Sequence, residues 1–159
     1  MGIPLTIIEE AVTTHAAALV LYARQFFTDR SFHEAEEVVQ DVFLRLSCQT
    51  EPPDNVAAWL YTAVRNGAIN AARNNKRREK REAEHWTPLF KPDEESPFDT
   101  EKIALCLEKL DPRQREIVLL HIWSDLPFAD IATLLGQPKT TVFRRFTEAL
   151  ETLRQLLEL

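Results

Sequence analysis

Glycine, cysteine and histidine are scarce in this chain, which has three glycines, two cysteines and four histidines among its 159 residues. Few segments alternate between apolar and polar residues with period two, so we expect an all-α protein. Cys48 and Cys106 each stand alone, and the histidines are scattered without the spacing of metal ligands. We therefore expect no metal site, and we interpret these residues as structural or incidental.

Motifs of catalysis are absent as well. The sequence contains no glycine-rich phosphate loop and no recognisable nucleophile motif. Adjacent acids such as Glu36 and Glu37 lie in a helical pattern, where solvated surface charges are the usual explanation. We expect a protein that has no catalytic residues, is not an enzyme and needs no cofactor.

Membrane-targeting segments are the third absence. We find no apolar run long enough to cross a membrane. The first ten residues, MGIPLTIIEE, lack the basic end and the apolar centre of a signal peptide. These observations predict a cytoplasmic protein without membrane insertion.

The negative charge is concentrated in one short stretch of the chain. The net charge is −6, and residues 83–100 alone carry one Lys/Arg against five Asp/Glu, together with three prolines. Residues 1–82 and 101–159 are each nearly neutral. This distribution predicts two small helical domains, 1–82 and 101–159, joined by an acidic, proline-containing linker at 83–100.

Residues 34–46, EAEEVVQDVFLRL, have the clearest amphipathic pattern in the sequence. One apolar stripe is formed by Ala35, Val38, Val39, Val42, Phe43 and Leu46. Leu44 lies off this stripe, among acids and an amide. An exposed leucine in that setting predicts a docking surface, whereas the alternative is a helix whose polar face is merely solvated.

Residues 56–82 form a segment that begins apolar and becomes basic, and Asp54 or Asn55 is placed to cap its helix. Between Arg73 and Arg81 there are six Lys/Arg and one acid. Aromatic residues and amides precede this block. Because such groups hold unstacked bases while arginines hold phosphates, the segment predicts a nucleic-acid surface. The alternative is a core helix that ends in solvated charge, and for Trp59 alone we favour burial.

Residues 101–123 predict two helices separated by Asp111-Pro112. In the second helix Ile117 and Leu120 have the spacing of buried residues, with Trp123 as a further candidate. Its first turn carries Arg113 and Arg115, although cations are unfavourable at that end of the helix dipole. That position weakly indicates an external anion, and solvation is the alternative.

Residues 127–150, PFADIATLLGQPKTTVFRRFTEAL, predict two helices around a tight turn. Gly136 is placed to end the first helix and Pro138 to begin the second. The second helix has an apolar stripe and an outward basic side. The predicted stripe consists of Val142, Phe146 and Leu150. This pattern favours a helix-turn-helix that reads DNA, against an ordinary helical hairpin with a solvated charged side.

Three segments resemble, in order, parts of one protein family. They are EAEEVVQDVFLRL, AWLYTAVRNGAINAARNNKRR and LDPRQREIVLLHIWSDLPFADIATLLGQPKTTVFRRFTEALETLR. They are similar to the core-binding, promoter-melting and distal-promoter-reading parts of extracytoplasmic-function (ECF) sigma factors of bacterial RNA polymerase. The chain departs from the family's usual pattern at Pro127, Pro138, Thr140 and Phe143.

The resemblance implies an alternative sigma factor that binds core RNA polymerase, reads the minus-thirty-five and minus-ten promoter elements and helps to open the DNA. The implied contacts to the clamp helices of the large polymerase subunit are Glu37, Gln40, Asp41, Leu44 and Arg45. The implied minus-ten contacts are Trp59, Asn66, Asn70, Arg73, Arg77 and Arg78, with the two asparagines near the pocket for a flipped base. The implied minus-thirty-five contacts are Arg113, Lys139, Thr140, Thr141, Arg144 and Arg145.

The resemblance also implies partners: the polymerase clamp helices and flap, promoter DNA, and an anti-sigma factor or other regulator. It accounts for the acidic net charge, because polymerase supplies much of the phosphate contact that an acidic protein lacks. Two other hypotheses remain. One is a stand-alone helix-turn-helix transcription regulator, and the other is a helical adaptor whose basic stretches are only solvated.

Overall fold

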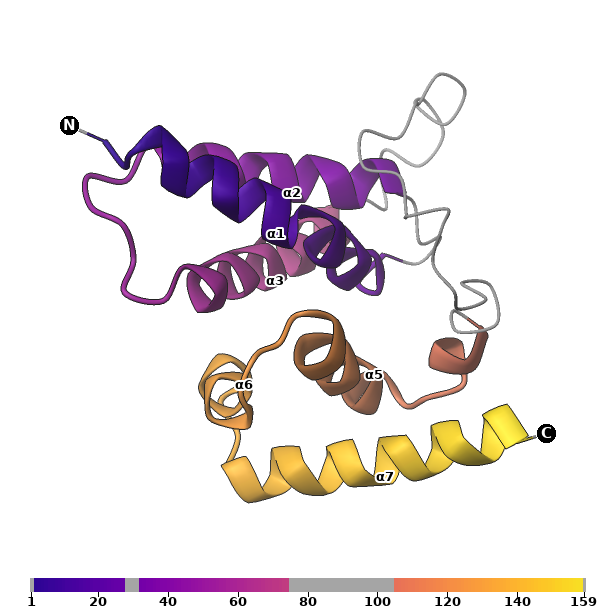
Figure 1. The fold of residues 1–159 in the computed structure, drawn as a ribbon. Coiled ribbons are helices and arrows are strands. Elements are labelled where there is room, and N and C mark those ends of the chain that lie inside the picture. The colour runs from indigo at the N-terminus through magenta and orange to yellow at the C-terminus, as the bar shows by residue number, and fades with distance from the viewer. Residues whose placement is uncertain (1, 28–31, 75–104, 159) are drawn as a thin grey trace. The chain divides into compact units, whose positions relative to one another are not determined.

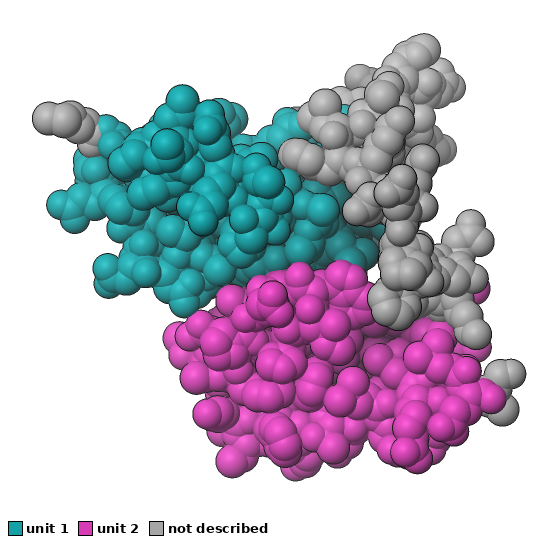
Figure 2. Space-filling view, viewed as in Figure 1, with its two compact units in different colours: residues 1–91 teal, residues 92–159 magenta. Residues whose placement is uncertain are grey.

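The computed structural model describes residues 2–27, 32–74 and 105–158. Every regular element within these ranges is a helix, which confirms the predicted all-α class (Figure 1). The chain divides into two compact units, residues 1–91 and 92–159 (Figure 2), and each is described below by itself. The predicted linker at 83–100 lies outside the described residues.

The first unit packs three helices against one another: α1 (Leu5–Arg24), α2 (Phe32–Ser47) and α3 (Val56–Asn74). Each contributes fully buried side chains to one core. The largest of them are Leu19, Tyr22, Val39, Val42, Leu46, Leu60, Tyr61 and Val64. Tyr22 and Tyr61 meet edge to face, with ring centroids 5.6 Å apart. The apolar stripe predicted for residues 34–46 is therefore the buried face of α2.

α1 corrects one expectation drawn from the sequence. It is long and apolar enough, by length and composition alone, to cross a membrane, with a hydropathy of 1.2. It nevertheless contacts both α2 and α3, and its residues Leu19, Tyr22 and Ala23 are completely buried in the three-helix core. A core helix meets the same criteria of length and composition because its inner face must be apolar.

Glu36 is a second correction, because it is buried rather than solvated. Glu36 as a whole is 1% exposed, whereas the side chain of Glu37 is 61% exposed. Consecutive residues on an α-helix point about 100° apart, since one turn takes about 3.6 residues. Glu36 therefore shares the inner side of α2 with Val39 and Phe43, and only Glu37 faces outward.

α2 and α3 approach each other closely at Gly67. A Cβ atom built on this glycine would lie 3.1 Å from Cγ1 of Val38. A mid-helix glycine costs about 1 kcal/mol relative to alanine, so the close approach explains its presence in α3. At the start of α3, the backbone N–H of Ala58 donates to Oδ1 of Asn55 at 3.0 Å. Asn55 is thus the N-cap, as the sequence allowed.

The second unit contains α5 (Pro112–Val118), η2 (Leu119–Trp123), α6 (Phe128–Leu135) and α7 (Lys139–Glu158). Residues 105–108, which precede them, are also helical. Asp111 caps α5 by accepting the backbone N–H of Arg113 at 2.9 Å, and Pro112 is the first helical residue. The sequence predicted the start of a helix at this Asp-Pro pair, and the structure adds the cap by the Asp111 side chain.

η2 continues α5 as a single wider, π-helical turn. Ser124 Oγ donates to the Leu119 carbonyl at 3.1 Å, and the Leu126 N–H donates to the Leu120 carbonyl at 3.1 Å. The predicted burial of Ile117 and Leu120 is confirmed, but the candidate burial of Trp123 is wrong, because that residue is 39% exposed. A π-turn holds more residues than an α-turn, so the side chains beyond it depart from the 3.6-residue pattern.

Candidate nucleic-acid interface

The turn between α6 and α7 is built on Gly136. This residue has φ 65° and ψ 37°, in the left-handed region. Its N–H donates to the Thr133 carbonyl at 3.3 Å, and the Gln137 N–H donates to the Ala132 carbonyl at 3.0 Å. These two bonds satisfy carbonyls at the end of α6. A Cβ at position 136 would meet nothing within 4 Å, so glycine is required by the backbone conformation alone.

α7 begins directly after Pro138, whose carbonyl accepts the N–H of Val142 at 3.1 Å. Only Val142 and Ala149 of its twenty residues are buried, and Phe146 is half-buried. Leu150 was predicted to continue the apolar stripe but is 40% exposed. Ala149 is buried in its place, because it lies seven residues after Val142. Seven residues make almost two full helical turns, whereas Leu150, eight residues after Val142, points away from the buried side. α7 therefore has a narrow buried stripe.

The outward side of α7 carries the predicted cations and one unexpected aromatic ring. The exposed residues between 139 and 147, near the N-terminal end of α7, are Lys139, Thr140, Phe143, Arg144 and Thr147. Thr141 is half-buried beside them. The structure thus brings Lys139, Thr140 and Arg144 together on one solvent-facing surface, with Phe143 at its centre.

Arg145 differs from the other predicted residues of α7. It is half-buried, and its Nη1 donates to Oε1 of Gln137 at 2.7 Å. This bond ties the second turn of α7 to the residue that follows Gly136. It uses one of the five N–H donors of the guanidinium. Arg145 therefore helps to stabilise the turn between α6 and α7, and its hydrogen bond to Gln137 fixes the orientation of its side chain.

An aromatic cluster holds α7 against the rest of the second unit. The His121 ring stacks on Phe128 with centroids 4.1 Å apart, and it meets Phe146 edge to face at 4.8 Å. Phe128 meets Phe146 at 5.1 Å and Phe143 at 5.6 Å. The carbonyl of Leu126 lies 2.9 Å from His121 Nδ1, and because a carbonyl can only accept, Nδ1 donates. The sequence prediction missed this cluster.

The two arginines at the start of α5 have different environments. Arg115 donates from Nε to the Leu107 carbonyl at 2.7 Å, and from Nη2 to the carbonyls of Glu108 at 3.0 Å and Leu110 at 3.1 Å. The expected external anion is therefore wrong for Arg115, because backbone carbonyls of the preceding segment already accept the hydrogen bonds of its guanidinium. Arg113 is exposed, so the prediction of an anion contact stands only for that residue.

α3 carries the predicted strand-binding residues along one line. Trp59, Asn66, Asn70 and Arg73 are separated by seven, four and three residues, which are nearly whole helical turns. Asn66, Asn70 and Arg73 are exposed, and Trp59 is half-buried. Tyr61, on the opposite side of α3, is completely buried. Arg77 and Arg78 lie outside the described residues.

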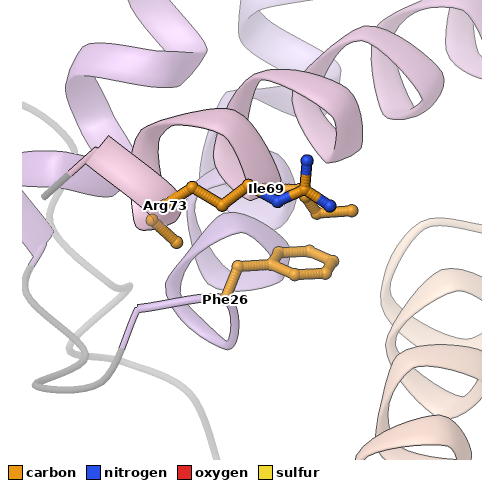
Figure 3. Close-up of a pocket in the computed structure, with 4 residues that line it drawn as sticks. Phe26, Ile69 and Arg73 are labelled. Carbon is orange, nitrogen blue, oxygen red and sulfur yellow. The ribbon is translucent and has the colours of Figure 1, made fainter.

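A shallow hollow of about 420 Å³ lies beside the C-terminal end of α3. It is lined by Phe26, Ile69, Ala72 and Arg73. Figure 3 shows the Phe26 ring and the Arg73 side chain extending along the same hollow. The sequence did not predict this feature, because Phe26 follows α1 and the other three residues belong to α3.

The outward side of α2 gathers all five residues of the predicted docking surface. Glu37 and Asp41 have side chains 61% and 71% exposed, Arg45 is 53% exposed and Leu44 is 65% exposed. Gln40 is half-buried between them. Arg45 Nε lies 3.8 Å from Asp41 Oδ2, and an exposed pair of this kind contributes little to folding stability. The surface is thus a charged rim around an apolar side chain.

The described residues contain no group of three or more His, Cys, Asp and Glu that could hold a metal ion. Cys48 is exposed and Cys106 is buried, and both are free thiols. The three surfaces described above therefore consist of charged, amide, hydroxyl and aromatic side chains.

Two curated relatives illustrate the similarity to known proteins. The ECF RNA polymerase sigma factor RpoE of Cereibacter sphaeroides is 27% identical over 130 residues, which cover 77% of this chain and 71% of that protein. The RNA polymerase sigma factor SigV of Bacillus subtilis is 26% identical over 136 residues, covering 84% of this chain and 81% of its own length.

Two solved structures are similar in fold. The sigma factor RpoE in complex with the anti-sigma factor NepR from Bartonella quintana has a TM-score of 0.69 at 23% identity, covering 95% of this chain and 96% of that chain. CnrH in complex with the cytosolic domain of CnrY has a TM-score of 0.63 at 22% identity, covering 98% and 90%. At these identities the likeness concerns the fold.

Two family models match along the chain: "Sigma-70 region 2" over residues 11–78 and "Sigma-70, region 4" over residues 100–153. The first match contains most of α1 and all of α2 and α3, and the second contains α5, η2, α6 and most of α7. Together they span well over half of the sequence, so the chain belongs to the sigma-70 family of RNA polymerase sigma factors, in its ECF group. It is an alternative sigma factor that directs transcription initiation, and its family works by guiding polymerase rather than by catalysis.

Proposed function

We propose that three solvent-facing surfaces divide the work of this sigma factor. The outer side of α2 docks on the clamp helices of the large polymerase subunit. The outer side of α3 captures the non-template strand of the minus-ten element, and the outer side of α7 reads the minus-thirty-five element. Residues 1–82 would act as region 2, residues 101–159 as region 4, and residues 83–100 as the linker. The observation that carries this proposal is that each predicted set has exposed members gathered on one side of one helix.

The α2 surface supports docking because it combines an apolar centre with a polar rim. Leu44 is 65% exposed, and Glu37, Asp41 and Arg45 surround it. A large exposed leucine gains free energy when a partner covers it, and charged neighbours select a partner of complementary charge. Polymerase is the partner expected from the family, and docking there places the first unit beside the DNA.

The α3 surface supports strand capture because its amides and its cation lie in a single line. Asn66 and Asn70 offer both hydrogen-bond donors and acceptors to the edge of an unpaired base. Arg73, one turn further on, is placed for a backbone phosphate, and half-buried Trp59 offers an aromatic edge near the start of the line. Melting is then favoured, because hydrogen bonds and stacking with the protein offset the base pairing and stacking that the strand loses when the duplex opens.

The α7 surface supports recognition of bases in the major groove, because only a narrow stripe of this helix is buried against its own unit. The major groove, about 12 Å wide, admits an α-helix. Lys139, Thr140 and Arg144 lie near the N-terminal end of α7, which is the end that meets base edges in helix-turn-helix proteins. Thr141 and Arg145 lie beside them, and exposed Arg113 on α5 is placed for a phosphate.

The same proposal covers regulation and location. The solved structures similar to this chain are described as complexes of a sigma factor with an anti-sigma factor, or with the cytosolic domain of a second protein. We propose that this chain too acts in the cytoplasm under an anti-sigma factor or similar regulator, with the polymerase flap as a further contact of the second unit. It needs no cofactor for this work.

Transcription reconstituted with core RNA polymerase tests the division of work. A promoter selected from a random library by the holoenzyme serves as template. With wild-type protein we expect promoter-specific transcripts, and we expect the free protein to bind the same promoter poorly. Tight binding by the free protein, with no need for core enzyme, would instead support the stand-alone regulator.

Two arginines on α7 provide a matched pair for the same assay. Arg144 lies on the proposed reading surface, whereas Arg154 is near the far end of the helix, 68% exposed and beside Glu151 and Glu158. Arg144→Gln should reduce promoter-specific transcription, and it should also reduce the salt dependence of promoter binding if Arg144 contacts a phosphate, since each lost phosphate contact lowers that slope. Arg154→Gln should change neither, and equal losses in both variants would contradict the assignment of α7.

A further inference from the structure

Phe143 is the one large apolar residue at the centre of the reading surface of α7. It is 57% exposed, and the residues one turn away on the same side include Lys139, Thr140 and Thr147. Arg144 is its direct neighbour. More than half of this phenylalanine therefore remains in contact with water in the protein alone. Its setting among cations and hydroxyls suits a negatively charged partner with a small apolar group.

The ring of Phe143 is supported from one side. It meets the Phe128 ring edge to face, with centroids 5.6 Å apart and planes at 83°. Phe128 in turn stacks on His121 at 4.1 Å, and His121 is held by its hydrogen bond to the Leu126 carbonyl. Such contacts restrict the rotamers of Phe143 before any partner arrives. A side chain fixed in this way costs less conformational entropy to bind.

We propose that Phe143 selects thymine at one position of the minus-thirty-five element by packing against the C5-methyl group of the base. The proposal rests on the proposed reading role of α7. Thymine alone presents a methyl group in the major groove, and apolar side chains recognise it there. A phenyl ring has no donor or acceptor for the other base edges, so its discrimination comes from the methyl group alone.

Synthetic promoters provide the test, because deoxyuridine keeps the base pairing of thymine and removes only the methyl group. Each thymine of the selected minus-thirty-five element is replaced singly by deoxyuridine, and holoenzyme binding and transcription are measured. With wild-type protein, one replacement should weaken promoter binding about fourfold, the value of one buried methyl-sized group. The other replacements should have smaller effects.

Variants of this protein then identify the residue responsible. In Phe143→Ala the responsive thymine and its deoxyuridine counterpart should bind equally well, and Phe143→Leu should keep part of the preference. Leu150→Ala, which alters another exposed apolar residue of α7, should leave the full fourfold difference in place. Thermal unfolding of each variant shows whether the aromatic cluster survives, and the methyl preference of Phe143→Leu remains informative if the alanine variant is unstable.

The outcomes separate this inference from the function on which it rests. If wild-type holoenzyme shows no promoter-specific transcription, the proposed function fails. If transcription is normal but no deoxyuridine replacement distinguishes wild type from Phe143→Ala, the thymine contact is wrong and the reading role of α7 stands. That second result would assign the exposed ring to a protein partner instead.

Discussion

α2 and α3 in the first unit differ from α7 in the second by how they expose their candidate binding residues. α2 and α3 bury one full side in the three-helix core, including Val39, Leu46 and Val64. α7 buries only Val142 and Ala149. Packing therefore fixes the outer faces of the first unit, whereas turn geometry and an aromatic cluster fix α7. The two units should respond differently to the same kind of substitution.

Truncation of a core leucine should have the largest effect and should fall on the first unit. Leu46 is completely buried on α2. Leu46→Ala should lower the free energy of unfolding by ~2–5 kcal/mol, because the lost burial adds to the cost of a cavity. Urea denaturation followed by circular dichroism measures this loss. A change below about 1 kcal/mol would mean that the core of the first unit tolerates a void. Core packing would then not be what distinguishes α2 and α3 from α7.

Substitution of Gly136 should act on the second unit through geometry rather than burial. Gly136→Ala forces an L-residue into the left-handed region, at a cost of ~1–2 kcal/mol. Because nothing crowds a Cβ there, the cost is conformational, and relaxation of the turn would move α7. We expect reduced promoter-specific transcription with unchanged affinity for core polymerase. Gly136→Asn should lose less, since asparagine tolerates this conformation, and equal losses in both variants would argue for another cause.

Truncation of Leu44 should separate binding from folding within one helix. Leu44→Ala should weaken core polymerase binding about fivefold, as expected for a moderate contact of about 1 kcal/mol at an interface. The free energy of unfolding should change by less than about 0.5 kcal/mol, because the side chain is exposed. Leu5→Ala is the matched control, since Leu5 is 68% exposed on α1. An equal loss of polymerase affinity in the control would place the docking surface elsewhere.

A pH dependence from His15 should be the smallest of these effects. Burial lowers the pKa of His15 below its ordinary value of 6.5. Between the folded pKa and 6.5 the unfolded chain binds more protons, so stability falls as the pH is lowered through 6.5 toward the folded pKa. Thermal unfolding above and below pH 6.5 should show a shallower decline in His15→Gln than in wild type. An identical decline in both would assign the dependence to another group.

Features that depend on neighbouring residues in sequence were predictable. Asp111-Pro112, Asn55 and Gly136 occur where the sequence placed them, because caps and turns are decided within a few residues. The exposed side of α2 was predictable for the same reason, since the helical period alone separates Leu44 from Leu46. The candidate residues of α3 and α7 also follow that period.

Features that depend on contacts between elements were not predictable. Arg115 donates hydrogen bonds to carbonyls of the segment before α5, and Arg145 donates one to Gln137. Neither arginine is therefore fully free in solvent, as its place on the helix suggested. The π-turn of η2 displaces Trp123 from the regular pattern. The ring contacts among His121, Phe128 and Phe143 join three helices, and no residue spacing in the sequence predicts them.

The close approach at Gly67 has a mechanical consequence. Because a Cβ on residue 67 would lie only 3.1 Å from Cγ1 of Val38, a side chain at this position would have to displace Val38 or widen the spacing between α2 and α3. The distance between the outer sides of the two helices therefore depends on the absence of a side chain at residue 67. If the proposed surfaces are correct, a substitution of Gly67 would alter the spacing between the polymerase-docking side of α2 and the strand-capturing side of α3.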